Sequence, residues 1–249
     1  IMNPSLLFIA SGKGGVGKTW LSTGLALLWS RQKLRTLLVD GDLGAANIDV
    51  QMGFRARWTL ADVLAKRCTL QQAVSAGVDS HLHVIAGKSG MNAVDLMSAE
   101  RLMFVREALH RLSCQYAYSL LDLGAGLGTG VRSWMKICHK GVIVITPDPS
   151  SLTDGYAAIK TIRSLCPHMQ SVGVVVNMAE SDHEGQQTYS LFAKSCQKLL
   201  NFSPTLLGVV LWDDRIRSCM RKQTHVFDMF PTGHSADQLR HVSRGIEVL

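Results

Sequence analysis

The sequence of 249 residues holds 26 lysines and arginines against 19 aspartates and glutamates, which gives a formal charge of +7. Hydrophobic residues make up 47% of it and charged residues 18%, a balance that excludes an intrinsically disordered chain and suits one folded domain over 1–249. The six cysteines are widely spaced without a CxxC pair, which argues against zinc, an iron–sulfur cluster or disulfides and favours buried thiols. We expect a cytoplasmic protein whose charge favours anionic partners such as nucleotide, DNA or anionic lipid.

Short β-branched runs alternate with amphipathic stretches along the chain, as in βαβ units. In chain order, the predicted strands are Leu6–Ala10, Thr36–Asp40, His83–Ala86, Ser119–Asp122, Val142–Thr146, Val172–Asn177 and Leu206–Leu211. The predicted helices are Lys18–Gln32, Ala99–Ser113, Ser151–Leu165, Gly185–Leu200 and Ser235–Leu249, with shorter helical turns elsewhere. The pattern predicts an α/β fold, a doubly wound and mainly parallel sheet with helices on both faces.

Two of these helices carry an apolar stripe. In the helix 99–113 the apolar positions at helical spacing are Leu102, Val105, Leu109 and Leu112, whereas we expect Arg101, Glu107 and Arg111 to face solvent. In the last helix the stripe consists of Leu239, Val242, Ile246 and Leu249. A stripe of this kind fits either core packing or contact with lipid, and its short length favours packing here.

A glycine-rich loop is the strongest chemical signal. The segment 12–19 reads G-K-G-G-V-G-K-T, fits G-x-x-x-x-G-K-[ST], and lies between a predicted strand and a predicted helix. The backbone N–H groups of Gly14, Gly15, Val16 and Gly17 are expected to converge on phosphates at the positive end of the helix. Lys18 would neutralise the β- and γ-phosphates, and the Thr19 hydroxyl would bind Mg²⁺. The segment therefore predicts a site for ATP or ADP with Mg²⁺; the alternative is a plain turn with a solvated lysine.

Acidic residues follow two predicted strands. Asp40 and Asp42 are two residues apart, so both can face one Mg²⁺ and its water, although an Asx-turn would also account for them. Asp122 ends an apolar strand in the manner of a Walker B segment and is expected to hold Mg²⁺ through water. Gly124 and Gly126 behind it would let the backbone approach the γ-phosphate.

The loop also resembles a particular variant of this motif. With its second lysine, Lys13, the run K-G-G-V-G-K-T is similar to the deviant Walker A motif of the MinD/ParA superfamily. The resemblance implies an ATPase that dimerises when it binds ATP, with Lys13 reaching the phosphates of the partner and Lys18 acting on its own nucleotide. It further implies that Asp42 orients the attacking water, Asp40 lies near the metal, and Asn177 contacts adenine, although Asn177 also suits a plain strand-end turn.

One position departs from the superfamily pattern. Trp20 replaces the small polar residue that usually follows the loop threonine, while its backbone N–H stays available to the α-phosphate. We expect Mg-dependent hydrolysis that is slow and stimulated by partners. A third alternative, beside a regulator and a partitioning ATPase, is that Trp20 makes the chain a nucleotide-gated binding module with negligible hydrolysis.

Three longer stretches resemble the flagellar-number regulators of this superfamily, the FlhG/FleN group. They are 40–53, 149–160 and 215–230. The resemblance implies restraint of a transcriptional activator and stimulation of the GTPase FlhF. Contact with the inner face of the cell membrane would be peripheral and would need a targeting tail of the family type, which this sequence does not contain.

The basic positions of the stretch 215–230 support a second interpretation. These positions are Arg215, Arg217, Arg221 and Lys222. At helical spacing they could bind DNA phosphates without sequence preference, as in a partitioning ATPase of the ParA kind. A solvated helix face would account for them equally well, so we favour the regulator over the partitioning ATPase.

Overall fold

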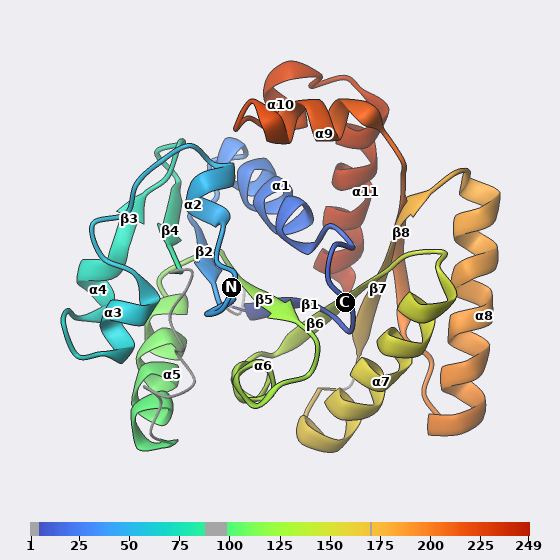
Figure 1. Cartoon of the computed structure of the whole chain (residues 1–249), viewed down its shortest axis with the longest axis horizontal. Coiled ribbons are helices and arrows are strands. Elements are labelled where there is room, and N and C mark those ends of the chain that lie inside the picture. Colours follow the sequence, from blue (N-terminus) through green and yellow to red (C-terminus); the bar gives the residue numbers. More distant parts are fainter. Residues whose placement is uncertain (1–4, 88–98, 170) are drawn as a thin grey trace.

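The computed structural model describes residues 5–87, 99–169 and 171–249, and its strands form one eight-stranded sheet in the order β3-β4-β2-β5-β1-β6-β7-β8 (Figure 1). The strands are β1 (Ser5–Ser11), β2 (Thr36–Asp40), β3 (Val74–Ala76), β4 (Leu82–Ile85), β5 (Tyr118–Ala125), β6 (Lys140–Ile145), β7 (Val172–Ala179) and β8 (Thr205–Leu211). All neighbouring strands pair in parallel except β3 with β4. The predicted doubly wound, mainly parallel sheet is confirmed.

Helices cover both faces of this sheet (Figure 1). They are α1 (Lys18–Arg31), α2 (Ile48–Gln51), α3 (Leu60–Leu64), α4 (Leu70–Ala73), α5 (Ala99–Ser113), α6 (Thr129–Met135), α7 (Pro149–Leu165), α8 (Asp182–Leu200), α9 (Asp214–Arg221), α10 (Val226–Met229) and α11 (His234–Val248). Alternate residues of β1 serve two separate cores, because strand side chains point to opposite faces in turn. Leu6 and Phe8 pack with α5 to α8, and Leu7 and Ile9 pack with α1, α10 and α11. No helix within the described residues has the length and hydropathy needed to cross a membrane.

Several elements begin earlier than the sequence pattern predicted. The helix expected from Ser151 begins at Pro149, because proline suits the first turn of a helix. The helix expected from Gly185 begins at Asp182, where the Ser181 hydroxyl accepts the Glu184 N–H at 3.2 Å. The three-residue strand β3 was not predicted, since so short a run carries no periodic signal.

The apolar stripes of the two helices are buried as predicted, whereas one arginine was assigned wrongly. In α5 the residues Leu102, Val105, Leu109 and Leu112 are buried, and in α11 so are Leu239, Val242 and Ile246, which confirms packing. Arg101 does not simply face solvent. Its guanidinium donates to the carbonyl oxygens of Val63 and, at 3.2 Å, Leu64 at the end of α3. Those carbonyls need a donor at the helix end, which the solvent-facing assignment overlooked.

The cysteines are all free thiols, as expected. Four of them are buried: Cys138, Cys166, Cys196 and Cys219. Cys114 is exposed, however, and Cys68 is only partly buried, so the prediction of buried thiols was wrong at these two positions. Cys114 follows the end of α5, where the chain turns at the surface before β5.

Candidate functional site

The glycine-rich loop joins the carboxyl end of β1 to the amino end of α1. Gly15 has a φ of +76° and Gly17 a φ of +91°, in the left-handed region that favours glycine. No side chain caps the first turn of α1, so its N–H groups are left for an anion. A Cβ atom on Gly17 would lie 2.2 Å from the Asn177 amide nitrogen, so the close approach of β7 also requires glycine there.

Lys18 lies at the bottom of this loop, almost fully buried. Its Nζ donates to the Ser11 hydroxyl at 2.9 Å, and that hydroxyl donates to the Lys13 carbonyl oxygen at 2.5 Å. Burial lowers the pKa of Lys18, and the negative charges of Asp122 and Asp42 raise it in part. A buried ammonium held by one hydroxyl has donors left for phosphate oxygens.

Asp40 and Asp122 lie side by side, because β2 and β5 place them in register. The Asp40 carboxylate accepts the N–H groups of Asn47 at 3.0 Å, Asp42 at 3.1 Å and Ile48 at 3.2 Å. Burial, with the negative charge of Asp122, raises the pKa of Asp40 to about 7. Asp40 therefore anchors the segment that follows β2.

Asp122 is bonded to the first turns of α1. Burial raises the pKa of Asp122 to about 6. Hydrogen bonds from the Thr19 and Ser22 hydroxyls, the latter at 2.9 Å, oppose this rise because they stabilise the charged carboxylate. The described residues contain no preformed group of three or more metal-binding side chains. Such a site matches Mg²⁺, which binds through one or two protein oxygens and the phosphates of its nucleotide, and a divalent cation here would lower both raised carboxyl pKa values.

Asp42 forms an Asx-turn beside the cavity. Its carboxylate accepts the N–H groups of Ala45 at 2.9 Å and Gly44 at 3.1 Å, as in an Asx-turn. It also lines the cavity in front of the glycine-rich loop. Gly124 leaves room for the Asp42 carboxylate, since a Cβ atom on Gly124 would lie 3.0 Å from the Asp42 Cγ.

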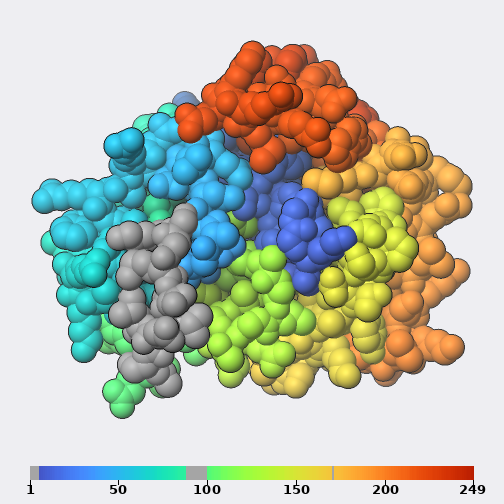
Figure 2. Space-filling model, viewed as in Figure 1, coloured from blue at the N-terminus to red at the C-terminus, as the bar shows by residue number. Residues whose placement is uncertain are grey.

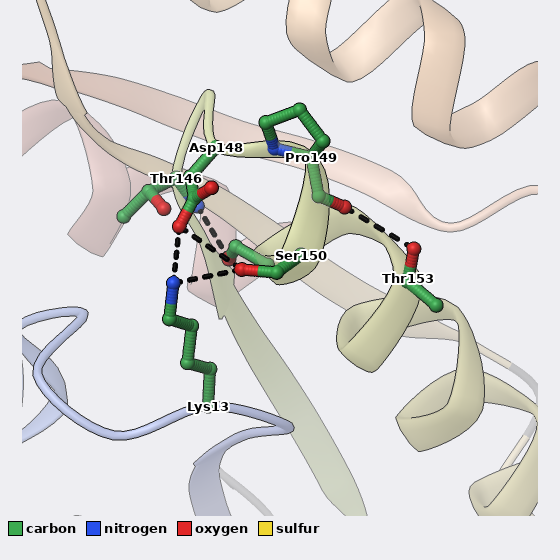
Figure 3. Close-up of polar contacts among 7 residues, drawn as sticks. Lys13, Thr146, Asp148, Pro149, Ser150 and Thr153 are labelled. Carbon is green, nitrogen blue, oxygen red and sulfur yellow. Dashed lines mark hydrogen bonds and ion pairs between the residues drawn. The ribbon is translucent and has the colours of Figure 1, made fainter.

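Lys13 points toward the amino end of α7 (Figure 3). Its ammonium pairs with the Asp148 carboxylate and donates to the Ser150 hydroxyl at 2.7 Å, both at the amino end of α7. The Lys13 side chain is 41% exposed. The pairing holds Lys13 within its own chain, a contact that the sequence did not reveal.

The cavity has a volume of about 690 Å³ and continues beyond the loop to α9. Figure 2 shows the blue loop segment reaching the surface directly below the orange-red α9 and α10. Besides the loop and Asp42, its lining includes Trp20, Asn177, Met178, Leu211, Trp212, Ile216, Arg217 and Met220. The sequence did not lead us to predict Met178, Ile216 and Met220 as lining residues. For Ile216 and Met220, the apolar positions between the basic residues of α9 could have indicated a buried or ligand-facing side of that helix. The far end of the cavity combines apolar and aromatic side chains with charged ones such as Arg217, a composition that suits a base with its ribose.

Two of these lining residues are held by neighbours. The Asn177 amide donates to the Val16 carbonyl oxygen at 2.8 Å, so it fixes the glycine-rich loop to the end of β7. Trp212 is half exposed and carries the Arg217 guanidinium 5.3 Å above its ring. The Asn177 amide, which the sequence led us to expect at the adenine, is therefore already hydrogen-bonded to the loop.

Trp20 separates the cavity from α10. Its ring is buried and stacks on His225 with centroids 5.5 Å apart and planes at 16°. Gly24 in α1 makes room for this stack, because a Cβ atom there would lie 2.8 Å from the His225 ring. Burial lowers the pKa of His225 to about 4, so the ring is neutral near pH 7.

A phosphate-binding loop, a buried lysine and two strand-end carboxylates in a doubly wound sheet define a P-loop nucleotide-binding domain. The family model CbiA, the CobQ/CobB/MinD/ParA nucleotide binding domain, matches residues 7–226. The chain belongs to this family, whose MinD/ParA branch consists of nucleotide-binding ATPases.

Two curated proteins are similar over nearly the whole chain. The antiactivator FleN of Pseudomonas aeruginosa is 30% identical over 99% of this chain and 88% of its own length. The flagellum site-determining protein YlxH of Helicobacter pylori is 30% identical over 95% of this chain and 81% of its own length. Among solved structures, the septum site-determining protein MinD complexed with Mg-ADP from Pyrococcus horikoshii superposes with a TM-score of 0.83 over 98% of this chain and 96% of that chain, at 22% identity. At that identity the likeness shows the fold alone.

Proposed function

We propose that the chain is an ATP-dependent switch that dimerises with ATP, hydrolyses it slowly to ADP and phosphate, and regulates the number or placement of flagella. The observation that carries the proposal is the pair of loop lysines, with Lys18 buried beneath the phosphate site and Lys13 exposed on the opposite side of the loop. Only an exposed lysine can reach a second chain. The flagellum site-determining protein YlxH supplies the flagellar context, and the antiactivator FleN supplies the link to an activator.

The catalytic roles follow from the contacts of each side chain. The N–H groups of the loop and Lys18 bind the β- and γ-phosphates. Thr19 and Asp122 would hold Mg²⁺, with Asp40 beside them, and the metal would supply positive charge next to the phosphates. Asp42 orients the attacking water, since its carboxylate is fixed by two backbone N–H groups and faces the cavity.

Dimerisation requires Lys13 to exchange partners. In the single chain it pairs with Asp148, and in the ATP dimer it binds the phosphates of the partner's nucleotide. Hydrolysis removes the γ-phosphate and returns Lys13 to Asp148, which couples turnover to separation. The ATP dimer then presents the surface that is recognised by protein partners of the flagellar regulatory kind, a transcriptional activator or an FlhF-like GTPase.

Molar mass by light scattering tests the switch. With ADP the chain is expected to be monomeric, and with ATP and Mg²⁺ Asp42→Ala is expected to double its mass, because binding is retained and hydrolysis is lost. Lys13→Ala in the same background is expected to stay monomeric while still binding ATP. The proposal would be overturned if the dimer formed equally well with ADP and with ATP, and also after Lys13→Ala.

DNA partitioning is the weaker candidate. Of the basic residues on α9, Arg215 donates to Asp213 at 2.9 Å and Arg217 lies over Trp212, so two of them already have partners. Salt-dependent binding of the Asp42→Ala ATP dimer to arbitrary duplex DNA would favour partitioning, and its absence favours the regulator.

A further inference from the structure

A second hollow of about 500 Å³ lies away from the nucleotide cavity, beside the C-terminal half of α5. The segment 136–139, which leads into β6, forms its other side, together with the turn before β7. This hollow lies where β6 begins, whereas the nucleotide cavity lies where the parallel strands end. The two sites are therefore at opposite ends of the strands. The basic residues that line the hollow are Arg106, His110, Arg111, Lys136, His139 and His168.

The charge of this hollow, which we call the α5 hollow, is one-sided. Three permanent cations, Arg106, Arg111 and Lys136, face a single acid, Glu107, so the net charge is 3 − 1 = +2 with neutral histidines. Glu107 offsets little, because its carboxylate is 3.9 Å from Arg111 and both side chains are 67% exposed. Protonation of a histidine would add further positive charge.

Basic side chains lie close together in the α5 hollow, and one of their donors is unpaired within the described part of the chain. The His110 and His139 rings lie 5.4 Å apart. The Arg106 Nε is fully buried and has no hydrogen-bond partner among the described residues. An unpaired guanidinium N–H is unfavourable, and Arg106 lines a hollow in which a carboxylate of a bound molecule would pair with its guanidinium.

Apolar side chains next to these charges indicate what kind of molecule fits. Met103 lines the hollow and is 57% exposed, and Phe104 beside it is 56% exposed. Methionine, phenylalanine and arginine together are typical of protein interfaces, whereas surfaces that bind DNA are more polar. A lipid bilayer is flat and cannot enter a concave site. The shape and composition therefore favour a protruding protein segment.

We propose that the α5 hollow binds a segment of a protein partner that presents two or more carboxylates beside one apolar side chain. The carboxylates pair with Arg106 and Lys136, and the apolar side chain packs on Met103. The site is separate from the nucleotide cavity and does not depend on the proposed flagellar role.

The test uses the full chain with saturating ADP and Mg²⁺, so that the nucleotide cavity is occupied. The probe is a fluorescein-labelled peptide, Glu-Glu-Leu-Glu-Glu, and its anisotropy is titrated at about 50 mM salt, where screening is weak. The double variant Arg106→Gln/Lys136→Gln is expected to raise the Kd about tenfold, because two charged contacts are lost. The matched control, Lys194→Gln/Lys198→Gln on the exposed side of α8, removes the same charge and is expected to leave the Kd unchanged.

A second variant separates charge from geometry. Arg106→Lys keeps the charge but loses the Nε donor, so its Kd is expected to lie between those of the wild type and the double variant. Unchanged ADP affinity and thermal unfolding establish that the variants fold. The proposal is overturned if the wild type does not bind the peptide, if the double variant binds it equally well, or if the α8 control weakens it as much. It is also overturned if anionic vesicles or duplex DNA, and not the peptide, depend on Arg106 and Lys136.

Discussion

The two ends of the nucleotide cavity differ in the side chains that line them and in how far apart these lie in the sequence. The phosphate end consists of one continuous loop and two strand ends, with Lys18, Asp40 and Asp122 all buried. The other end, proposed for the base, is richer in apolar and aromatic side chains, and it brings Met178 and Trp212 together from distant parts of the chain. Charged contacts in a buried setting are strong and depend on geometry, whereas apolar contacts are weaker and tolerate change. Binding energy should therefore be concentrated at the phosphate end.

Removing the buried lysine is the strongest test of this difference. Lys18→Ala is expected to weaken ATP binding by roughly 100-fold, about 3 kcal/mol, since charge-assisted hydrogen bonds to phosphate disappear. Isothermal titration calorimetry measures the effect, and Lys33→Ala, which removes an exposed lysine just after α1, serves as the control. A comparable loss of ATP affinity in both variants would contradict the idea that binding energy is concentrated at the phosphate end.

The buried carboxyls should make the nucleotide-free protein sensitive to pH. The pKa of Asp40 is raised from 3.8 to about 7, so the folded state holds this proton more tightly than the unfolded state does. The free energy of unfolding should therefore fall as pH rises from about 4 to about 7, by at most ~1.4 kcal/mol per pH unit from this group. Urea unfolding of Asp40→Asn without Mg²⁺ is expected to show a smaller slope, with Asp122 still contributing. An identical slope would mean that Asp40 titrates normally.

The base end should respond less strongly. Trp212→Ala is expected to weaken ATP binding about fivefold, because a half-exposed ring contributes on the order of 1 kcal/mol of aromatic contact. Phe104→Ala removes a similarly exposed aromatic far from the cavity and should change nothing in the same titration. If Trp212→Ala matched Lys18→Ala in its effect, the contrast between the two ends would fail.

The smallest effect is expected at the Lys13 ion pair. Asp148→Asn removes the partner that holds Lys13 in its own chain, and an exposed ion pair contributes little because solvent screens it. In the Asp42→Ala background, the ATP dimer should therefore form two- to threefold more tightly, as measured by concentration-dependent light scattering. A weaker dimer would show that Asp148 supports the dimer and does not compete with it.

The same contrast explains what the sequence could predict. The positions of Lys18, Asp40 and Asp122 follow from local patterns, because a motif sets the loop and parallel strands end at one edge of the sheet. Such patterns say nothing about which distant groups a side chain will meet. The bond from Asn177 to Val16 and that from Arg101 to the end of α3 depend on tertiary packing, and so does most of the base end.

Gly24 and His225 lie 201 positions apart in the chain, yet they are not independent in an evolutionary sense. A Cβ atom on Gly24 would lie 2.8 Å from the imidazole and 2.9 Å from the Leu239 Cδ1, so any larger residue at 24 requires a smaller one at 225 and a shift of the Leu239 side chain. Either substitution alone should therefore be selected against, by a clash in one case and by an empty space beside Trp20 in the other. Across an alignment of related chains, the two positions should change together.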